Sequence, residues 1–174
     1  MTEKIPSQIE KFSQEIRRMY GEDQDMRERA LDDQGVIENK EDEKLDVKNT
    51  DRMKEIIRDI GWPTVIKFGV EISNMAWLLV QHADHDIEFQ KYCLELMKTA
   101  SEGEISKRNI AYLEDRVRVN EGRLQLYGTQ FGGEGDNFGP RPIEDPDNVD
   151  IRRSELGMET LEEYTKVLKE KYNK

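Results

Sequence analysis

The chain is poor in the residues that most often carry nucleophilic chemistry. Its 174 residues include one cysteine and two histidines. The single cysteine, Cys93, excludes an internal disulfide, fits a reducing compartment and lies among apolar neighbours that predict an inert buried thiol. The sequence also lacks the Gly-x-Ser-x-Gly turn of serine hydrolases and a phosphate-binding P-loop. Nucleophilic catalysis of the usual kinds is therefore poorly supported.

Long apolar runs are absent as well. The longest, Met75 to Val80, is far too short to cross a bilayer, and residues 1–6 hold no apolar signal region. We therefore expect a soluble, cytoplasmic protein. The net charge of −11 argues against nucleic acid or an anionic membrane as partner, because like charges repel. The same charge permits a basic protein partner, although solubility alone also accounts for it.

Apolar residues recur at helical spacing along most of the chain. The pattern predicts helices over residues 7–20, 22–33, 52–60, 63–82, 87–100, 106–119 and 160–172, with a short helical turn over 150–155. After Gly122 the pattern alternates as in a strand over 123–131, and a glycine- and proline-rich stretch follows. The predicted fold is mainly α: a compact helical domain around a central buried helix, with a small β hairpin near residues 123–143.

Charge patterning suggests how the chain is divided. Residues 39–51 are dominated by charge, and we interpret them as a linker or loop. This interpretation leaves an N-terminal helical segment over 1–38 and a core helical domain over 52–174. We expect these two parts to form one globular unit.

The helix expected over 63–82 is apolar almost all round, which predicts a place at the centre of the core. On a helical wheel, the polar side chains of this helix and of the residues just after it fall within an arc of about 100°. They are Lys67, Glu71, Asn74, Gln81, His82 and His85. A solvent face with a Lys67–Glu71 ion pair explains the first half of this stripe best. For its second half we favour a polar cavity, because loops converge where the helix ends.

The two histidines are spaced so that both could face one point. With Asp84 or Asp86, His82 and His85 could bind a metal, but a third ligand would have to be a distant carboxylate, so we predict no metal site. A general acid or base at His82, oriented by Asp84 or Asp115, needs fewer coincidences. A structural histidine bonded to a backbone carbonyl explains His82 about equally well.

Two other segments offer groups that could contact a substrate. Arg116 could clamp an anion, although a buried structural bridge to an acidic side chain is the better explanation. Tyr127, Thr129 and Gln130 supply donors and acceptors suited to a ligand-contacting strand edge, or to an ordinary hairpin. Together with Gln81 these are the predicted substrate contacts. The glycine-rich run that follows could be a lid.

Several segments, taken in order, resemble a bacterial domain family of unknown function. They are Gly61-Trp62-Pro63-Thr64, Gln81-His82-Ala83-Asp84 with Phe89-Gln90, Asp115-Arg116-Val117, Tyr127-Gly128-Thr129-Gln130, and Arg152-Arg153 with Glu163-Tyr164. The resemblance covers about residues 52–168 and implies one intact domain. It supplies no reaction. Its most diagnostic segments, Gln-His-Ala-Asp and Tyr-Gly-Thr-Gln, are among those selected above on chemical grounds.

Two functions remain open from the sequence, and neither names a cofactor. The first is a small-molecule or peptide-modifying enzyme with His82 as general acid or base. The second is an acidic binding or immunity-type protein that neutralises a basic protein partner. An enzyme predicts a concave pocket lined by His82, Arg116 and Tyr127. A binding protein predicts that the same groups are buried and satisfy one another.

Overall fold

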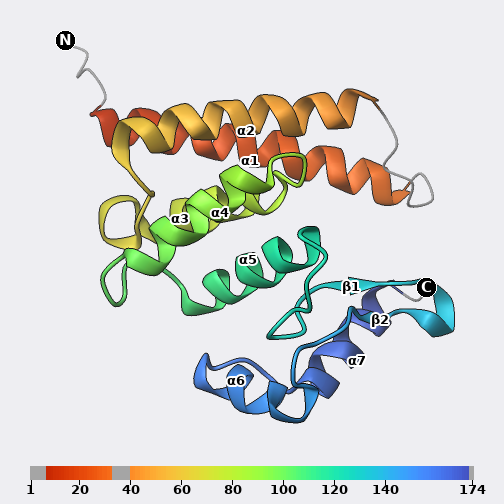
Figure 1. The fold of residues 1–174 in the computed structure, drawn as a ribbon. Helices are drawn as coiled ribbons and strands as arrows, with labels where there is room; N and C mark the ends of the chain where they lie inside the picture. The colour runs from red at the N-terminus through yellow and green to blue at the C-terminus, as the bar shows by residue number, and fades with distance from the viewer. Residues whose placement is uncertain (1–6, 33–39, 173–174) are drawn as a thin grey trace. The chain divides into compact units, whose positions relative to one another are not determined.

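The structure is a computed structural model that describes residues 7–32 and 40–172. Within them the chain forms seven α-helices, two short 3₁₀ helices and one two-stranded antiparallel hairpin (Figure 1). The predicted fold class, mainly α with a small β hairpin, is confirmed. The chain divides into two compact units, which we call unit 1, ending at Ile105, and unit 2, beginning at Ser106.

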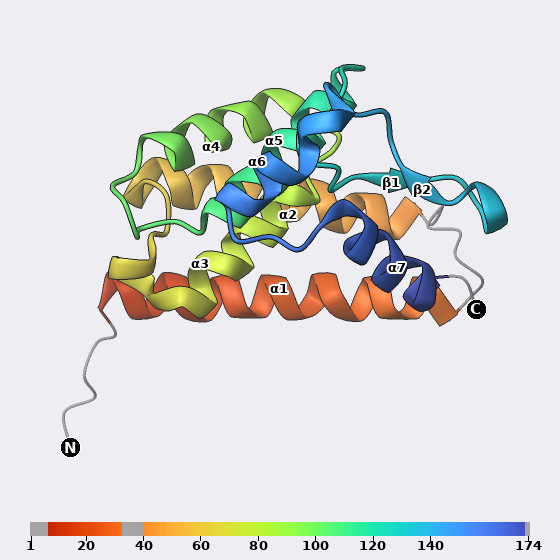
Figure 2. The ribbon, with the colours of Figure 1, turned by 90° about the horizontal axis from the view of Figure 1, so that it is seen from below.

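Unit 1 is a bundle of four helices. They are α1 (Gln8–Asp32), α2 (Lys40–Ile60), α3 (Val65–Gln81) and α4 (Ile87–Thr99). The first two lie side by side in opposite directions, and α3 packs against both (Figures 1 and 2). Apolar side chains at spacings of three and four residues turn inward from each helix. The core contains Phe12, Ile16, Met19, Met26, Met53, Ile56, Ile57, Ile72, Ala76, Leu79, Val80, Phe89, Cys93, Leu94 and Met97.

The first helix is longer than the sequence pattern predicts. Gly21 was expected to end it, with a second helix over 22–33, but α1 is continuous through this position. That prediction is wrong because one glycine inside a helix costs only about 1 kcal/mol, which tertiary packing overrides. The apolar face continues on both sides of Gly21, from Met19 to Met26, and both methionines are buried. Asp33 lies outside the described residues.

The second helix corrects the predicted linker. Residues 39–51 were expected to be a loop because of their charge, but α2 begins at Lys40 and runs to Ile60. Asn39 lies outside the described residues. The charged side chains did not prevent helix formation, because Lys and Glu are good helix formers and the helix buries one face. Asn49, Thr50 and Met53 are all buried on that face.

The central helix is bent near its start. Within α3, Gly69 has φ 80° and ψ 162°, a backbone conformation that glycine adopts without steric cost and that interrupts the helix. Before and just after this kink, Ile66 and Val70 are 73% and 61% exposed. The expectation of a central, buried helix therefore does not hold at this end and holds only farther along, where Ile72, Ala76, Leu79 and Val80 are buried.

Unit 2 combines three helices with the hairpin. Its elements are α5 (Lys107–Asn120), β1 (Phe131–Gly132), η1 (Gly135–Asn137), β2 (Gly139–Pro140), η2 (Pro146–Asn148), α6 (Val149–Glu155) and α7 (Leu161–Tyr172). The side chain of Ser106 caps α5 by accepting a hydrogen bond from the backbone of Asn109. A capping box begins α7, because Thr160 and Glu163 accept hydrogen bonds from each other's backbone N–H groups.

The β element is smaller than expected. A strand was predicted over 123–131, but β1 comprises only Phe131 and Gly132, which pair with Pro140 and Gly139. Upstream, Gln125 makes an isolated bridge to Ile143. The alternation of apolar and polar residues was a poor guide here, because side chains rather than a second strand satisfy most of the backbone over 126–130.

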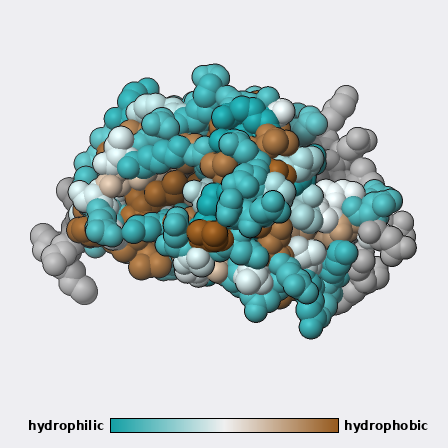
Figure 3. Space-filling view, turned by 60° about the horizontal axis from the view of Figure 1, so that its bottom comes forward, coloured by the Kyte–Doolittle hydropathy of each residue, from teal (hydrophilic) through white to brown (hydrophobic). Residues whose placement is uncertain are grey.

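Figure 3 shows one face, on which apolar patches are broken up by hydrophilic side chains. In the described part of the chain, no helix is long and apolar enough to cross a membrane.

Candidate functional site

His82 lies at the C-terminal end of α3, and its ring meets two charged residues of α1. Its Nδ1 lies 2.8 Å from Oδ1 of Asp23 and 2.9 Å from Nε of Arg27. Arg27 Nε also lies 3.2 Å from the Asp23 carboxylate, and its Nη2 donates to Oδ1 of Asp46, on α2, at 2.8 Å. We call these four residues, Asp23, Arg27, Asp46 and His82, the charged cluster. They join three helices of unit 1.

The neighbours of His82 determine where its proton lies. Both carboxylate oxygens of Asp23 are within 3.0 Å of Nδ1, so an unprotonated Nδ1 would direct its lone pair at a negative charge. The N–H of Arg27 Nε is directed at this same Nδ1, at 2.9 Å, as well as at Asp23 Oδ1, at 3.2 Å, and a bond to Nδ1 would favour the opposite tautomer. Because two carboxylate oxygens face Nδ1 against one N–H, we assign Nδ1–H as the donor to Asp23, with Arg27 Nε donating to the same carboxylate. In the neutral imidazole, Nε2 then carries the lone pair. Among the described residues, Nε2 has no hydrogen-bond partner.

Burial differs sharply within the charged cluster. The side chain of Asp23 is 1% exposed, whereas those of His82 and Arg27 are 15% and 24% exposed. Burial would raise the pKa of Asp23, but the hydrogen bond from His82 and the charges of His82 and Arg27 lower it below its usual value. Burial raises the pKa of Asp46, and Arg27 opposes this rise. Asp23 is thus a buried, ionised partner for a partly exposed imidazole.

Sequence analysis missed both carboxylates of the charged cluster. Asp23 occupies a core position of α1, four residues after Met19 and three before Met26, which are both buried. The assumed break at Gly21 hid this register. Asp46 fell within the predicted linker. A carboxylate that interrupts an apolar helical face was the available signal, because an unpaired buried charge is costly and such a residue needs a partner.

The other predicted residues around His82 have different surroundings. Gln81 is buried, and its Nε2 has no hydrogen-bond partner in the described structure. Asp84 is exposed and accepts a hydrogen bond from Gln90 Nε2 at 3.2 Å, rather than meeting His82. Gln90 also donates to the backbone carbonyls of Val80 and Gln81, which satisfies the last turn of α3. The expected Lys67–Glu71 pair is replaced by a contact of Glu71 with Arg17 at 2.6 Å.

Asp115, the second predicted orienter, is fully buried in unit 2. Its carboxylate accepts hydrogen bonds from the backbone N–H groups of Leu126, Tyr127 and Thr129 at 2.6 to 3.2 Å, and from Thr129 Oγ1 at 2.9 Å. Burial raises the pKa of Asp115, and these hydrogen bonds oppose the rise. The geometry is that of a carboxylate that fixes a loop to helix α5.

The predicted substrate contacts 127, 129 and 130 are held by further bonds within unit 2. Arg116 Nη1 donates to Oε1 of Gln130 at 3.3 Å. The buried side chain of Gln125 bonds to both the N–H and the carbonyl of Gln130. Arg153, fully buried, donates to the carbonyl of Tyr127 at 2.7 Å. The segment therefore acts as a junction between α5, the hairpin and α6.

Comparison with known proteins places the chain in a family. The model of the Family of unknown function (DUF6624) matches residues 11–174. The chain belongs to this family. The match begins in α1 and therefore includes Asp23, Arg27 and Asp46, which lie before the region of the resemblance noted in the sequence. No curated protein and no solved structure matches the chain.

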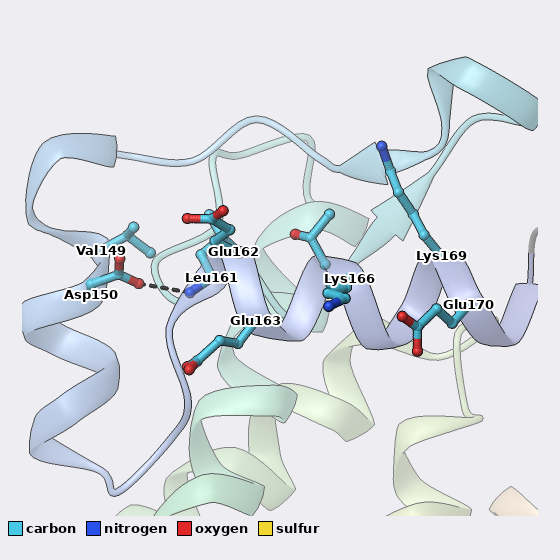
Figure 4. Close-up of a pocket in the computed structure, with 9 residues that line it drawn as sticks. Val149, Asp150, Leu161, Glu162, Glu163, Lys166, Lys169 and Glu170 are labelled. Carbon is cyan, nitrogen blue, oxygen red and sulfur yellow. Dashed lines mark hydrogen bonds between the residues drawn. The ribbon is translucent and has the colours of Figure 1, made fainter.

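A surface pocket of about 750 Å³ lies in unit 2, against α6 and α7 (Figure 4). Val149 and Leu161 supply apolar surface, and Lys166 and Lys169 are among the charged residues that line it. Asp150, also part of its lining, accepts a hydrogen bond from the backbone of Leu161 at 2.7 Å. None of the residues predicted for the site lines this pocket. Among the described residues, no three His, Cys, Asp or Glu side chains are placed to hold a metal ion.

Proposed function

We propose that this member of the family is an enzyme that modifies a small molecule or peptide, with His82 as its general acid and base. One observation carries the proposal: Nδ1 of His82 lies 2.8 Å from a carboxylate, Asp23, that is 1% exposed. This arrangement leaves Nε2 as the proton-accepting atom of the neutral ring. General acid–base catalysis requires an imidazole held in one tautomer and one orientation.

Each member of the charged cluster has a distinct role in this proposal. Asp23 positions the ring and stabilises the imidazolium that forms when Nε2 accepts a proton. Arg27 keeps Asp23 ionised, because its Nε lies 3.2 Å from the carboxylate. Asp46 fixes Arg27 through the 2.8 Å bond to Nη2. His82 alone would touch the reacting group, and the other three are positioning residues. The roles proposed from sequence for Asp84 and Asp115 pass to Asp23.

Two further observations bear on the proposed enzyme. The one cysteine is buried, and burial raises the pKa of its thiol, so Cys93 is unreactive. An inert single thiol fits a cytoplasmic enzyme whose chemistry depends on proton transfer. The predicted contacts Arg116, Tyr127, Thr129 and Gln130 are bonded within unit 2, so we assign them a structural role in place of substrate binding.

The test is an activity screen with small esters, amides and peptides, in which three variants are compared with the wild type. His82→Gln removes the proton-accepting atom and Asp23→Asn removes its partner. The matched control is His85→Gln, because His85 is the other histidine and is exposed. We expect turnover to fall by about 10²- to 10⁴-fold in His82→Gln, and to remain at the wild-type level in His85→Gln.

One result of this screen would contradict the proposed role of His82. Turnover that survives in a folded His82→Gln variant would exclude His82 from the chemistry. Turnover that falls equally in both histidine variants would point to a general loss of structure. Circular dichroism shows whether each variant is folded, and so whether a loss of turnover reflects lost chemistry or lost structure.

A second candidate function rests on the net charge of −11. An acidic protein of this size can neutralise a basic protein through complementary charge, and such binding weakens as salt screens it. The measurement is affinity for a panel of purified basic proteins at low and at moderate ionic strength. Saturable, stoichiometric binding to one member of the panel, unchanged in His82→Gln, would favour this candidate over the enzyme.

A further inference from the structure

Buried polar atoms without partners occur on α2 and α3, the two helices that carry Asp46 and lead to His82. Seven such side-chain atoms occur among the described residues, and four belong to Asn49, Thr50 and Gln81. These residues are 3%, 1% and 4% exposed. Both amide atoms of Asn49 are unpaired, as are Thr50 Oγ1 and Gln81 Nε2. A buried donor or acceptor without a partner costs about 1–3 kcal/mol, so this concentration indicates that another molecule completes the set.

These residues lie within about one helical turn of members of the cluster. Asn49 and Thr50 follow Asp46 by three and four positions, so they lie one turn along the same face of α2. Gln81 directly precedes His82 on α3. Arg27 bonds to Asp46 and lies 2.9 Å from the His82 ring, which ties these two helices together at this level. The partly exposed side chains of His82 and Arg27 give the cluster contact with solvent.

Charge restricts what can bind here. The cluster holds two carboxylates, Asp23 and Asp46, against one permanent cation, Arg27. With a neutral His82 the cluster is therefore negative, and an additional anion would be repelled. A cation has donors only and would leave Asn49 Nδ2 and Gln81 Nε2 without an acceptor, so the missing group is neutral and polar.

Hydrogen-bond geometry narrows the choice further. The side-chain amide of Asn49 presents a donor and an acceptor side by side. A primary carboxamide matches both at once, because its carbonyl accepts from Nδ2 while its syn N–H donates to Oδ1. The second lone pair of its carbonyl can accept from Gln81 Nε2. A hydroxyl has one oxygen and cannot make both parallel bonds, and a carboxylate would leave Oδ1 of Asn49 without a donor.

We infer that the substrate of the His82 site carries a primary carboxamide, which Asn49 and Gln81 bind. This inference rests on the proposed function, since it describes the molecule on which His82 acts. Asn49 and Gln81 determine specificity, and neither takes part in proton transfer. Such a carboxamide could belong to a free metabolite or to a side chain within a peptide, and both present the same chemistry to the site.

The test follows the side-chain NH₂ signals of Asn49 and Gln81 by NMR. Their loss in Asn49→Leu and Gln81→Leu assigns them in the spectrum of the wild-type protein. Titration with acetamide should shift both signals saturably. Acetate and isopropanol, the matched anionic and hydroxyl probes, should not. Asn49→Leu should bind acetamide about tenfold more weakly, because two neutral hydrogen bonds are lost.

Two results would overturn the inference. The first is the absence of a saturable shift with acetamide. The second is an equal shift with isopropanol, which would show that these atoms do not distinguish a carboxamide from a hydroxyl. Both are read on the wild-type protein, whose side-chain NH₂ signals can be assigned from triple-resonance spectra if a leucine variant fails to fold. Binding of acetamide should persist in His82→Gln, so the carboxamide site and the acid–base function can fail separately.

The source of the carboxamide needs two further probes. Free L-glutamine and a glutamine-containing tripeptide with capped ends carry the same group. Saturable binding of the first alone would assign a free metabolite, and binding of the tripeptide alone would assign a peptide. Failure of both to bind, with acetamide bound, would overturn the assignment of the carboxamide to the substrate.

Discussion

At the scale of single residues, the environment of His82 is unusual for a helical bundle. Polar side chains from three helices meet where an apolar layer would stabilise the fold more simply. Asp23 replaces an apolar residue in the core face of α1 and is 1% exposed. Taking a carboxylate out of water is costly, and its bonds to His82 and Arg27 offset that cost. Such an arrangement is typical of a functional site rather than of a core designed for stability.

Replacement of Asp23 by Asn should lower the free energy of unfolding by about 2 kcal/mol at neutral pH. The variant keeps the shape of the side chain but loses the charge that His82 and Arg27 require. Because the pKa of Asp23 is lowered in the folded state, its contribution is present above the ordinary value of 3.8 and is lost as the pH falls through the lower folded value. The wild type and the variant should therefore converge in acid, as measured by urea unfolding across pH.

The control for this prediction lies one position away. Glu22 pairs with Arg18 at 2.6 Å and with Lys48 at 3.6 Å, but its side chain is 38% exposed. Glu22→Gln should change the free energy of unfolding by no more than about 0.5 kcal/mol. An equal loss in both variants, or a difference for Asp23→Asn that persists in acid, would contradict the assigned role of Asp23.

At the scale of elements, the sequence predicted helices well wherever local and tertiary signals agree. The helices α4, α5 and α7 lie within one or two residues of the ranges predicted for them. Predictions of helix failed where local composition favoured a break but tertiary packing favoured a helix. These places are Gly21 in α1 and the charged first half of α2. These failures also hid Asp23 and Asp46. His82 could be selected as a candidate from sequence, but its partners depend on helix pairing, which no local pattern specifies.

Gly128 should tolerate substitution poorly. It has φ +67°, and an added Cβ would lie 2.6 Å from Cδ1 of Leu161 and 3.0 Å from Cδ1 of Ile143. We expect Gly128→Ala to lower the free energy of unfolding by about 2 kcal/mol, from backbone strain and overpacking. Gly21→Ala is the matched control, because an added Cβ there meets nothing within 4 Å and the helix is regular. That variant should gain about 0.5–1 kcal/mol. Equal effects in denaturant titrations would contradict this reading.

The loop between α5 and the hairpin should depend on Asp115. Asp115→Asn removes the charge that accepts bonds from the backbone of Leu126, Tyr127 and Thr129. Hydrogen exchange at these three amides should accelerate at least about tenfold. The exposed Glu155, also in unit 2, provides the control, and Glu155→Gln should leave the three rates unchanged. Protection that survives in Asp115→Asn would show that the loop is held by other contacts.

At the scale of the whole molecule, the two units carry different kinds of polar chemistry. The polar groups of unit 2 around Asp115 are bonded to one another and to the backbone, which is a structural arrangement. Unit 1 contains a partly exposed imidazole, an ionised buried partner and several unpaired amide atoms. The family match covers both units, from residue 11 to 174. Under the proposed function the chemistry lies in unit 1, and the bonded polar groups of unit 2 have a structural role.

The most direct test of this account is the tautomer of His82, read from a long-range ¹H–¹⁵N spectrum of the imidazole at a pH where the ring is neutral. The wild type should show a protonated Nδ1 and an unprotonated Nε2, and Asp23→Asn should lose this preference. Asp115→Asn should keep it, because the charged cluster lies wholly within unit 1. A protonated Nε2 in the wild type, or the same spectrum in Asp23→Asn, would contradict the claim that Asp23 prepares His82 for proton transfer.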